Sequence, residues 1–148
     1  MFSPKNILVP TDFSEYSDKA LQQAIDIAKQ FKSKIYLLHI IGLVIQCTVD
    51  YCLPPQTVDQ VENESVSSAK KMITEQLAKF PDSKSIAITA DIRKGTPYEE
   101  ILKDQQEKKI DLVVIASHGK TGLLSHLMGS VAEKVLRNVK CPVLLVRG

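Results

Sequence analysis

Short apolar runs alternate along this chain with stretches of helical periodicity, and this alternation restricts the fold more than any other feature. The apolar runs, which are typical of strands, occupy residues 5–10, 33–41, 85–95, 111–117 and 141–147. Apolar residues spaced three and four apart predict helices between them, at residues 14–31, 58–80, 97–107 and 130–138. Strands that alternate with helices are typical of a parallel sheet with right-handed crossovers and helices on both faces. We therefore expect one open, parallel, five-stranded α/β domain that spans residues 1–148.

Three of the expected helices carry start signals. Ser14 is a suitable N-cap for the first helix. Thr96 is followed by a proline and, three residues on, by Glu99, a strong helix start. Ser130 and Glu133 form an S-x-x-E capping box, which would explain Ser130 without any ligand.

The composition is that of an ordinary globular protein, with 44% hydrophobic and 24% charged residues. The net charge of +2 is weak and the Lys and Arg residues are dispersed, so the sequence does not predict nucleic-acid binding. The longest mostly apolar stretch, residues 35–45, has 11 residues, whereas a membrane-spanning helix needs about 20. Because the start shows no secretory signal either, we expect a cytoplasmic protein without a membrane partner.

The three cysteines, Cys47, Cys52 and Cys141, are an odd number in a chain large enough to fold without disulfides. This favours a reducing compartment, in keeping with the cytoplasm. Cys47 and Cys52 lie in residues 42–56, which have no clean period and are expected to form a long loop. Their C-x4-C spacing allows a metal site, but no second pair of ligands lies nearby, so two free thiols are the favoured interpretation.

The tripeptide GKT at residues 119–121 is also found at the end of the phosphate loop of many ATPases and GTPases. That loop reads G-x-x-x-x-G-K-[ST] and directly follows a strand, so its first glycine would be residue 114. Val114 occupies the position, inside an apolar run, and the match fails. The dinucleotide-binding pattern G-x-G-x-x-G does not follow the first strand, and the chain has no G-x-S-x-G nucleophile elbow.

Gly119 and Gly129 are nevertheless spaced to hold a phosphate in another way. Gly119 can adopt a positive φ and allows a close backbone approach. Gly129 and Ser130 open a helix, whose free N–H groups form an anion site. A loop folded back on itself would bring both glycines to the same phosphates. The capping box is the alternative explanation for Ser130, and the residues of this region leave both explanations open.

This segment resembles the signature of the universal stress protein family, G-x2-G-x9-G-[ST], in members that bind ATP. It reads Ala116-Ser117-His118-Gly119, nine further residues and Gly129-Ser130. Three other stretches are similar to family motifs: NILVPTDFS at 6–14, LLHII at 37–41 and KCPVLLVRG at 140–148. The resemblance extends over essentially the whole chain. It departs from the signature at Ala116, which stands in place of the first glycine.

The resemblance implies the strand order 3-2-1-4-5, which reverses between the first and fourth strands. Open α/β sheets bind ligands at such a switch point, at the carboxyl ends of the strands. The resemblance also implies cofactor-binding roles for Pro10, Thr11, Asp12, Ile40, Ile115, Ala116, Gly119, Lys120, Gly129, Ser130 and Val131.

The implied roles divide between the parts of ATP. Residues 10–12 would form the turn on the adenosine side, and Asp12 would contact adenine or a metal ion unless it is only a turn former. The backbone of Ile40 would face adenine, and residues 115–116 would line the ribose. The two glycines, with the two residues after the second, would hold the triphosphate. Lys120 would add charge or be a solvated loop residue.

The implied function is that of an ATP-binding stress-response regulator that takes Mg²⁺ with the nucleotide and whose nucleotide-bound dimer is read by partners. It would be at most a slow ATPase, because no nucleophile paired with a base is evident. His39 is interpreted as a core residue, whereas His118 and His126 lie in or beside the cleft. The alternative is a dimerisation or interaction module with a vestigial cleft, which Ala116 keeps open; a dedicated α/β enzyme ranks third.

The C-terminal strand is expected to join two copies of the chain. In the implied order it lies at an edge of the sheet, and it has no charge before Arg147. An apolar edge with unpaired backbone groups is an aggregation hazard unless it is covered. Antiparallel pairing with a second copy would cover it, and the resemblance implies a homodimer of this kind. The alternative is a monomer in which a loop covers this edge.

Overall fold

The computed structural model describes residues 1–120 and 127–148. Its elements are β1 (Asn6–Pro10), α1 (Glu15–Phe31), β2 (Lys34–Ile41), α2 (Pro55–Ala78), the 3-10 helix η1 (Pro81–Ser85), β3 (Ile88–Lys94), α3 (Pro97–Glu107), β4 (Leu112–Ala116), α4 (Ser130–Asn138) and β5 (Val143–Val146). The strands form one parallel sheet in the order β3-β2-β1-β4-β5. The predicted α/β architecture and strand order are therefore confirmed.

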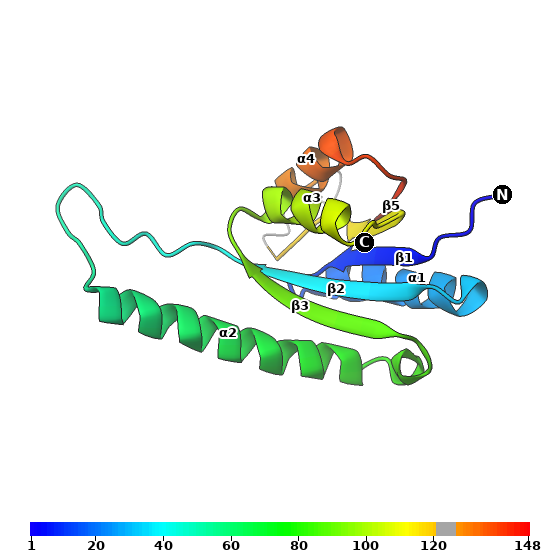
Figure 1. The fold of residues 1–148 in the computed structure, drawn as a ribbon, viewed down its shortest axis with the longest axis horizontal. Helices are drawn as coiled ribbons and strands as arrows, with labels where there is room; N and C mark the ends of the chain where they lie inside the picture. Colours follow the sequence, from blue (N-terminus) through cyan, green and yellow to red (C-terminus); the bar gives the residue numbers. More distant parts are fainter. Residues whose placement is uncertain (121–126) are drawn as a thin grey trace.

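Helices cover both faces of the sheet, with α1 and α2 on one side and α3 and α4 on the other (Figure 1). The central strand β1 contributes to both cores, because alternate residues of a strand point to opposite faces. Ile7 and Val9 pack on the α1 side, whereas Leu8 packs with Ile101 of α3 and Val135 of α4. This two-sided burial explains why the central strands are uninterrupted apolar runs.

Two boundaries differ from the prediction by three residues, and the others by two or fewer. Helix α2 begins at Pro55 rather than at residue 58, because proline suits the first turn of a helix, where its missing N–H costs nothing. Residues 81–85 form η1, which includes Ser85, and β3 begins at Ile88 rather than at residue 85 as predicted.

The predicted caps of the two later helices do not form as expected. Thr96 occupies the N-cap position of α3 but makes no side-chain capping bond in the described part of the chain. The predicted capping box of Ser130 and Glu133 is wrong. Gly129 is the N-cap of α4, which places Ser130 at the first helical position, and Glu133 instead accepts a hydrogen bond of 2.9 Å from Arg137.

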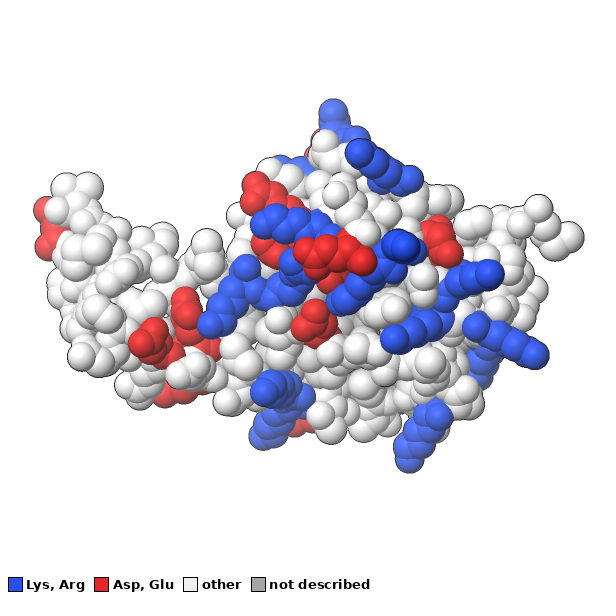
Figure 2. Space-filling view, viewed as in Figure 1, with Lys and Arg blue, Asp and Glu red and all other residues white. Residues whose placement is uncertain are grey.

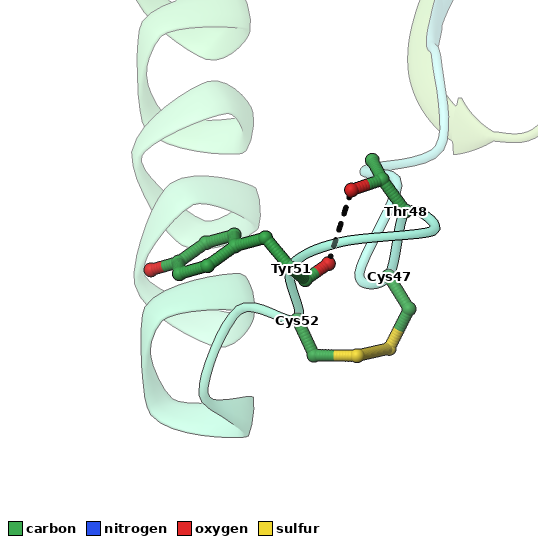
Figure 3. Close-up of a disulfide and its surroundings, with 4 residues drawn as sticks. All are labelled: Cys47, Thr48, Tyr51 and Cys52. Atoms are coloured by element: carbon green, nitrogen blue, oxygen red, sulfur yellow. Dashed lines mark hydrogen bonds between the residues drawn. A yellow bond between two sulfur atoms is a disulfide. The ribbon is translucent and has the colours of Figure 1, made fainter.

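The loop between β2 and α2 contradicts the prediction of free thiols. Cys47 and Cys52 form a disulfide and an isolated antiparallel bridge (Figure 3). A backbone hydrogen bond of 2.7 Å from the Thr48 N–H to the Tyr51 carbonyl closes the turn between them, and their Cα atoms lie 4.1 Å apart. The number of cysteines in the chain carries no information about such a local turn.

Residues 42–68, which we call the arm, extend beyond the edge of the sheet (Figure 1). The buried residues of α2 are Ala69, Ile73 and Gln76, all in its second half, so its first half does not pack on the core. The arm has no Lys or Arg, and its projecting end shows acidic but no basic side chains in Figure 2. Within the described ranges, no helix is both long enough and apolar enough to cross a membrane.

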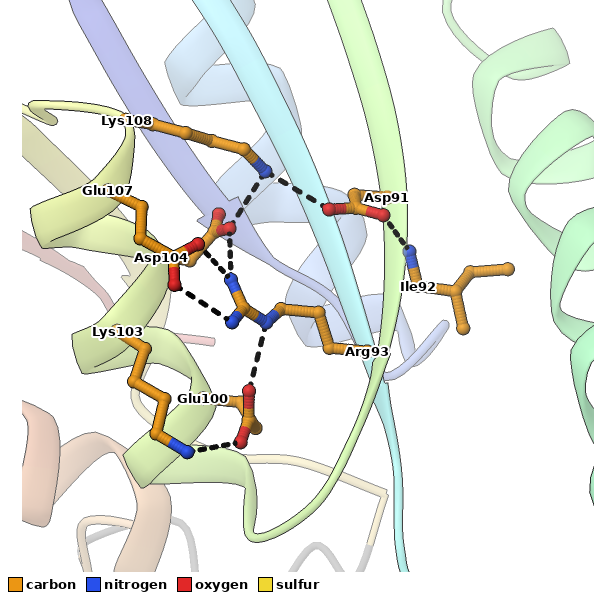
Figure 4. Close-up of polar contacts among 8 residues, drawn as sticks. All are labelled: Asp91, Ile92, Arg93, Glu100, Lys103, Asp104, Glu107 and Lys108. Carbon is orange, nitrogen blue, oxygen red and sulfur yellow. Dashed lines mark hydrogen bonds and ion pairs between the residues drawn. The ribbon is translucent and has the colours of Figure 1, made fainter.

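An ion-pair network fastens β3 to α3 (Figure 4). Arg93 of β3 donates to Glu100, Asp104 and Glu107 of α3, each at 2.9 Å. The side chain of Asp104 is fully buried and also accepts from Lys108 at 2.8 Å. The hydrogen bond to Glu107 raises the pKa of Arg93, so the guanidinium remains charged at all relevant pH values. The network fixes the start of α3 at the carboxyl edge of the sheet.

Candidate functional site

A cavity of about 380 Å³ opens at the carboxyl ends of the central strands. The described pairing of β1 with β4 ends at Leu8 and Val113, so the two strands separate where the strand order reverses. Ligands of open α/β sheets bind at this point, and the volume lies within the usual range of ligand sites. All the residues with a predicted cofactor-binding role line this cavity: Pro10, Thr11, Asp12, Ile40, Ile115, Ala116, Gly119, Lys120, Gly129, Ser130 and Val131.

Further lining residues were not singled out from the sequence: Ser17, Leu38, Pro97, Ile101, Ser117 and Ala132. The first turn of α3 could have been found, because every helix that follows a strand of a parallel sheet starts at the same edge. Leu38 and Ile101 could not, since they also belong to the buried core, and apolar periodicity does not separate core residues from cavity walls.

The backbone of Ile40 faces the side of β2 from which β1 has turned away. Even-numbered residues of β2 direct their backbone groups to β1, because Lys34 donates to Lys5 at 2.7 Å and Leu38 accepts from Thr11 at 2.8 Å. By the same alternation, the N–H and C=O of Ile40 point to this side, where the chain has already left the sheet. An adjacent donor and acceptor match the polar edge of a planar heterocycle such as a nucleobase.

Asp12 holds the turn after β1 and ties it to the glycine segment. Its Oδ1 accepts from the Ser14 N–H at 3.0 Å and from the Ser14 hydroxyl at 2.5 Å, the pattern of an Asx turn. Its Oδ2 accepts from the backbone N–H of Lys120 at 2.8 Å. Ser14 in turn caps α1 as predicted, since its Oγ accepts from the Ser17 N–H at 3.2 Å. Asp12 is thus a turn former, and its role as a metal ligand stays a prediction.

The two glycines of the signature are required for close approach. A Cβ at Gly119 would lie 2.6 Å from Oδ2 of Asp12, and one at Gly129 would lie 3.2 Å from the Ser117 carbonyl oxygen. Gly129 has an ordinary φ of −64°, and Gly95 is the glycine with positive φ among the described residues. Gly119 does not use the positive φ that a glycine can adopt, and close approach is what requires a glycine there. The Gly129 N–H donates to Ser117 at 2.6 Å and so closes the nine-residue stretch.

The start of α4 presents to the cavity N–H donors that have no partner among the described residues. Glu133 is the first residue of this helix whose N–H bonds backward, to Gly129 at 3.0 Å. The N–H groups of Ser130, Val131 and Ala132 precede it and have no partner within the helix. All three residues line the cavity, and the helix dipole adds partial positive charge there. This arrangement suits an anion, and the N–H of Gly129 is already engaged with Ser117.

The hydroxyl of Thr11 serves the fold rather than a ligand. It is buried and donates to Gln76 of α2 at 2.9 Å, and it accepts from the Phe13 N–H at 3.1 Å. Gln76 is itself buried and also donates to Asp18 at 2.8 Å. This network fixes the turn that carries Asp12. Sequence patterns could not reveal it, because Thr11 and Gln76 are 65 residues apart.

Two histidines also line the cavity. Nδ1 of His39 lies 2.8 Å from the Thr11 carbonyl, which can only accept, so this nitrogen carries the proton. Nδ1 of His118 lies 2.8 Å from the Ser117 hydroxyl, and its Nε2 is buried without a partner among the described residues. The contact agrees with the interpretation of His39 as a hydrogen-bonded residue, but the side chain is only partly buried and lines the cavity, so its assignment to the core is wrong. Thr121 and His126 lie outside the described residues.

Comparison with known proteins agrees with this architecture. A sequence model of the universal stress protein family matches residues 4–147. The chain belongs to the universal stress protein family. It is 33% identical to universal stress protein MJ0531 of Methanocaldococcus jannaschii over 143 residues. The matched residues cover 97% of this chain and 82% of that protein.

Solved structures of universal stress proteins share the fold. The structure of MJ0577, from the same organism, superposes with a TM-score of 0.84 at 30% identity, over 99% of this chain and 98% of the other. A universal stress protein in complex with cAMP superposes with a TM-score of 0.68 at 21% identity, over 99% and 98% of the two chains. At that identity the likeness establishes the fold alone.

Proposed function

We propose that this universal stress protein is a nucleotide-binding regulator, a single domain over residues 1–148 that takes ATP with Mg²⁺ into the cavity. One observation carries the proposal. The backbone of Ile40 and the free N–H groups at the start of α4 face one cavity, and they offer a heterocycle edge and an anion site respectively. A nucleotide needs this pairing of sites. A protein of the same fold has been solved in complex with cAMP, so this fold can hold a nucleotide.

The departure from the family signature at Ala116 does not close the cavity. Ala116 ends β4 and lines the cavity, which still measures about 380 Å³. The side chain of Ala116 therefore gives little reason to regard the cleft as vestigial. Nucleotide binding is favoured over a pure interaction module. We expect Ala116→Gly to change affinity less than changes at the start of α4.

Mg²⁺ enters with the triphosphate. Asp12 lies at the cavity with both carboxylate oxygens hydrogen-bonded, and its negative charge would repel uncomplexed phosphates. A divalent ion neutralises the phosphates and suits carboxylate and phosphate oxygens as ligands. ATP should therefore bind more tightly with Mg²⁺ than with a chelator present.

The test is titration calorimetry of Mg-ATP with two variants at Ser130. Gly129, with ψ of 151°, has the conformation preferred before proline, and Ser130 is the first helical residue. Ser130→Pro should therefore fold and lack one donor of the anion site. Because a hydrogen bond to a charged group contributes about 1.5–3 kcal/mol, we expect affinity to fall about 10- to 100-fold.

Ser130→Ala is the matched control, because it removes the hydroxyl that proline also lacks but keeps the backbone N–H. The ratio of the two affinities isolates the N–H contribution. Equal affinities for both variants would show that the start of α4 does not hold the phosphates. No heat from wild type at millimolar Mg-ATP, with unchanged circular dichroism, would favour the interaction module.

We further propose that the protein is a homodimer through β5, and that partners read the nucleotide state of this dimer. Strand β5 lies at the edge of the sheet, and Leu144 on it is 37% exposed. Its even-numbered residues bond to β4, since Val146 accepts from Ser117 at 2.9 Å. The N–H groups of Val143 and Leu145 therefore point outward, ready to pair with a second copy.

Sedimentation equilibrium of wild type and Leu145→Pro tests the dimer. Proline is tolerated on edge strands, and here it removes an outward N–H without breaking the ladder to β4. Wild type should sediment at about twice the 16.4 kDa of the chain, and the variant closer to that mass. A wild-type mass of one chain at micromolar concentration would exclude this dimer.

A further inference from the structure

The tip of the arm is a small hairpin closed by a disulfide. Besides the bond between Thr48 and Tyr51, the Leu53 N–H donates to the Gln46 carbonyl at 2.7 Å on the other side of the Cys47–Cys52 pair. Backbone bonds on both sides thus hold the two cysteines opposite each other. Figure 3 shows the disulfide that joins them. The hairpin itself, and not only the bridge, brings the sulfur atoms into reach.

Both cysteines are exposed, so an external thiol can approach either sulfur. The remaining cysteine of the chain differs from these two in both pairing and exposure. Cys141 is free and packs against the buried core, and burial raises the pKa of its thiol. A thiol of this kind reacts slowly, because the thiolate is the reactive form. Thiol chemistry on this protein should therefore concentrate on the hairpin.

We propose that Cys47 and Cys52 form a reversible redox site that exchanges with dithiol proteins of the thioredoxin class. A thiolate of the reductant attacks one sulfur, a mixed disulfide forms, and the other cysteine leaves as a thiolate that takes up a proton. The second thiol of the reductant then displaces the first cysteine. Two electrons and two protons pass to the hairpin, and the reductant becomes a disulfide. An oxidised dithiol of the same class reverses the reaction.

The charge of the arm favours exchange with dithiols over oxidation by peroxide. Peroxide reacts with a thiolate of low pKa, which nearby cations stabilise. The arm has no Lys or Arg, and Asp50 lies between the two cysteines in the turn. Reduction of the disulfide, in contrast, depends on access and on the thiolate of the attacking partner.

Reduction should release the hairpin and leave the sheet intact. An isolated two-stranded hairpin is marginally stable in water, and neither cysteine belongs to the buried core. The oxidised hairpin displays Val49 and Tyr51, which are 102% and 64% exposed. The two redox states would therefore differ in whether these apolar side chains are held in a defined arrangement.

Graded mixtures of oxidised and reduced dithiothreitol test the exchange, with alkylation and intact mass as the readout. We expect one two-electron transition in which two alkyl groups are gained together. Cys141→Ala should keep this transition, and Cys47→Ser should lose it. A transition that persists in Cys47→Ser, or alkyl groups gained one at a time, would overturn the proposal.

Limited digestion with chymotrypsin tests the release of the hairpin. Cleavage after Tyr51 should be about tenfold faster in the reduced protein, because the rate follows the population of the open segment. The disulfide joins the two fragments, so the digest must be reduced before its masses are read. Equal rates in both states would show that the hairpin does not respond to reduction. Neither measurement involves nucleotide, so a failure here is distinct from a failure of nucleotide binding.

Discussion

The cavity and the arm both begin at the carboxyl edge of the sheet, yet different kinds of contact hold them. In the cavity, residues distant in sequence meet, as Asp12 does with Lys120 and Thr11 does with Gln76. In the arm, the described hydrogen bonds are local, and the ion pair of Glu62 with Lys94 at 2.9 Å joins it to the sheet. The cavity is therefore part of the cooperative fold, whereas the arm is an appendage whose shape is set within itself.

This difference predicts opposite tolerances to change. A side chain added in the cavity meets atoms from another element, as the virtual Cβ of Gly119 meets Asp12. A side chain added at Gly42, at the base of the arm, meets nothing within 4 Å. Paired substitutions of the same residue type in the two regions can test this contrast.

The largest effect is expected for Gly119→Val. Its Cβ would lie 2.6 Å from Oδ2 of Asp12, which must move and lose its bond to Lys120. We expect Mg-ATP affinity to fall at least about 100-fold, equivalent to about 2.8 kcal/mol. Gly42→Val is the control and should bind and unfold as wild type does. Calorimetry and thermal unfolding of both variants decide this, and similar losses in both would remove the distinction between the regions.

A smaller effect is expected for a glutamine pair on α2. Gln76→Leu removes one acceptor of the buried Thr11 hydroxyl and the donor to Asp18, which should cost about 1–3 kcal/mol of unfolding free energy. Gln60 lies on the same helix within the arm and bonds only to the exposed Glu64 among the described residues. Gln60→Leu should change stability by less than about 0.5 kcal/mol. Urea unfolding gives both values, and equal costs would show that the first half of α2 is also part of the core.

A pH dependence is expected at the edge of the cavity, where α3 begins. The hydrogen bond from Lys103, together with that from Arg93, lowers the pKa of Glu100 from its ordinary value of 4.5. The stabilisation from a group with a lowered folded pKa is complete above its unfolded pKa and is lost as the pH falls through the folded value. Urea midpoints of wild type should therefore drop between pH 5 and about 3 more steeply than those of Glu100→Gln. Parallel curves would show that this carboxylate does not contribute.

Local patterns predicted the strands and helices, whereas the strand order and the residues that line the cavity were implied by the resemblance to the family. Apolar runs and helix periods recur within a few residues, and the signature segments follow the ends of strands. The reasons for individual residues were predicted less well. Gly119 is needed because a Cβ there would meet Asp12, and Gly129 because a Cβ there would meet the Ser117 carbonyl oxygen. Such contacts join separate segments, and no pattern of neighbouring residues encodes them.

The disulfide was not predicted, although it is local. Spacing alone does not distinguish a pair of free thiols from a pair held opposite each other in a turn. The deciding bonds are those of the backbone beside Thr48 and Leu53, which depend on the conformation of the loop. The disulfide of the arm is therefore a short-range feature that the sequence did not predict, because an irregular segment has no periodic pattern to read.

The smallest effect is expected for removal of the disulfide by Cys47→Ser with Cys52→Ser. A cross-link over so short a loop restricts the unfolded chain by about 2 kcal/mol in the chain-entropy description. Removing the disulfide lowers the free energy of unfolding by this full amount only if the native hairpin keeps its shape without the bridge. If the hairpin opens, the native chain gains the same conformational entropy as the unfolded chain, and the two gains cancel in the free energy of unfolding. Because the arm does not pack on the core, we expect a change below about 0.5 kcal/mol in urea unfolding without reductant. A loss of about 2 kcal/mol would instead mean that the hairpin is stable by itself and that reduction cannot release it.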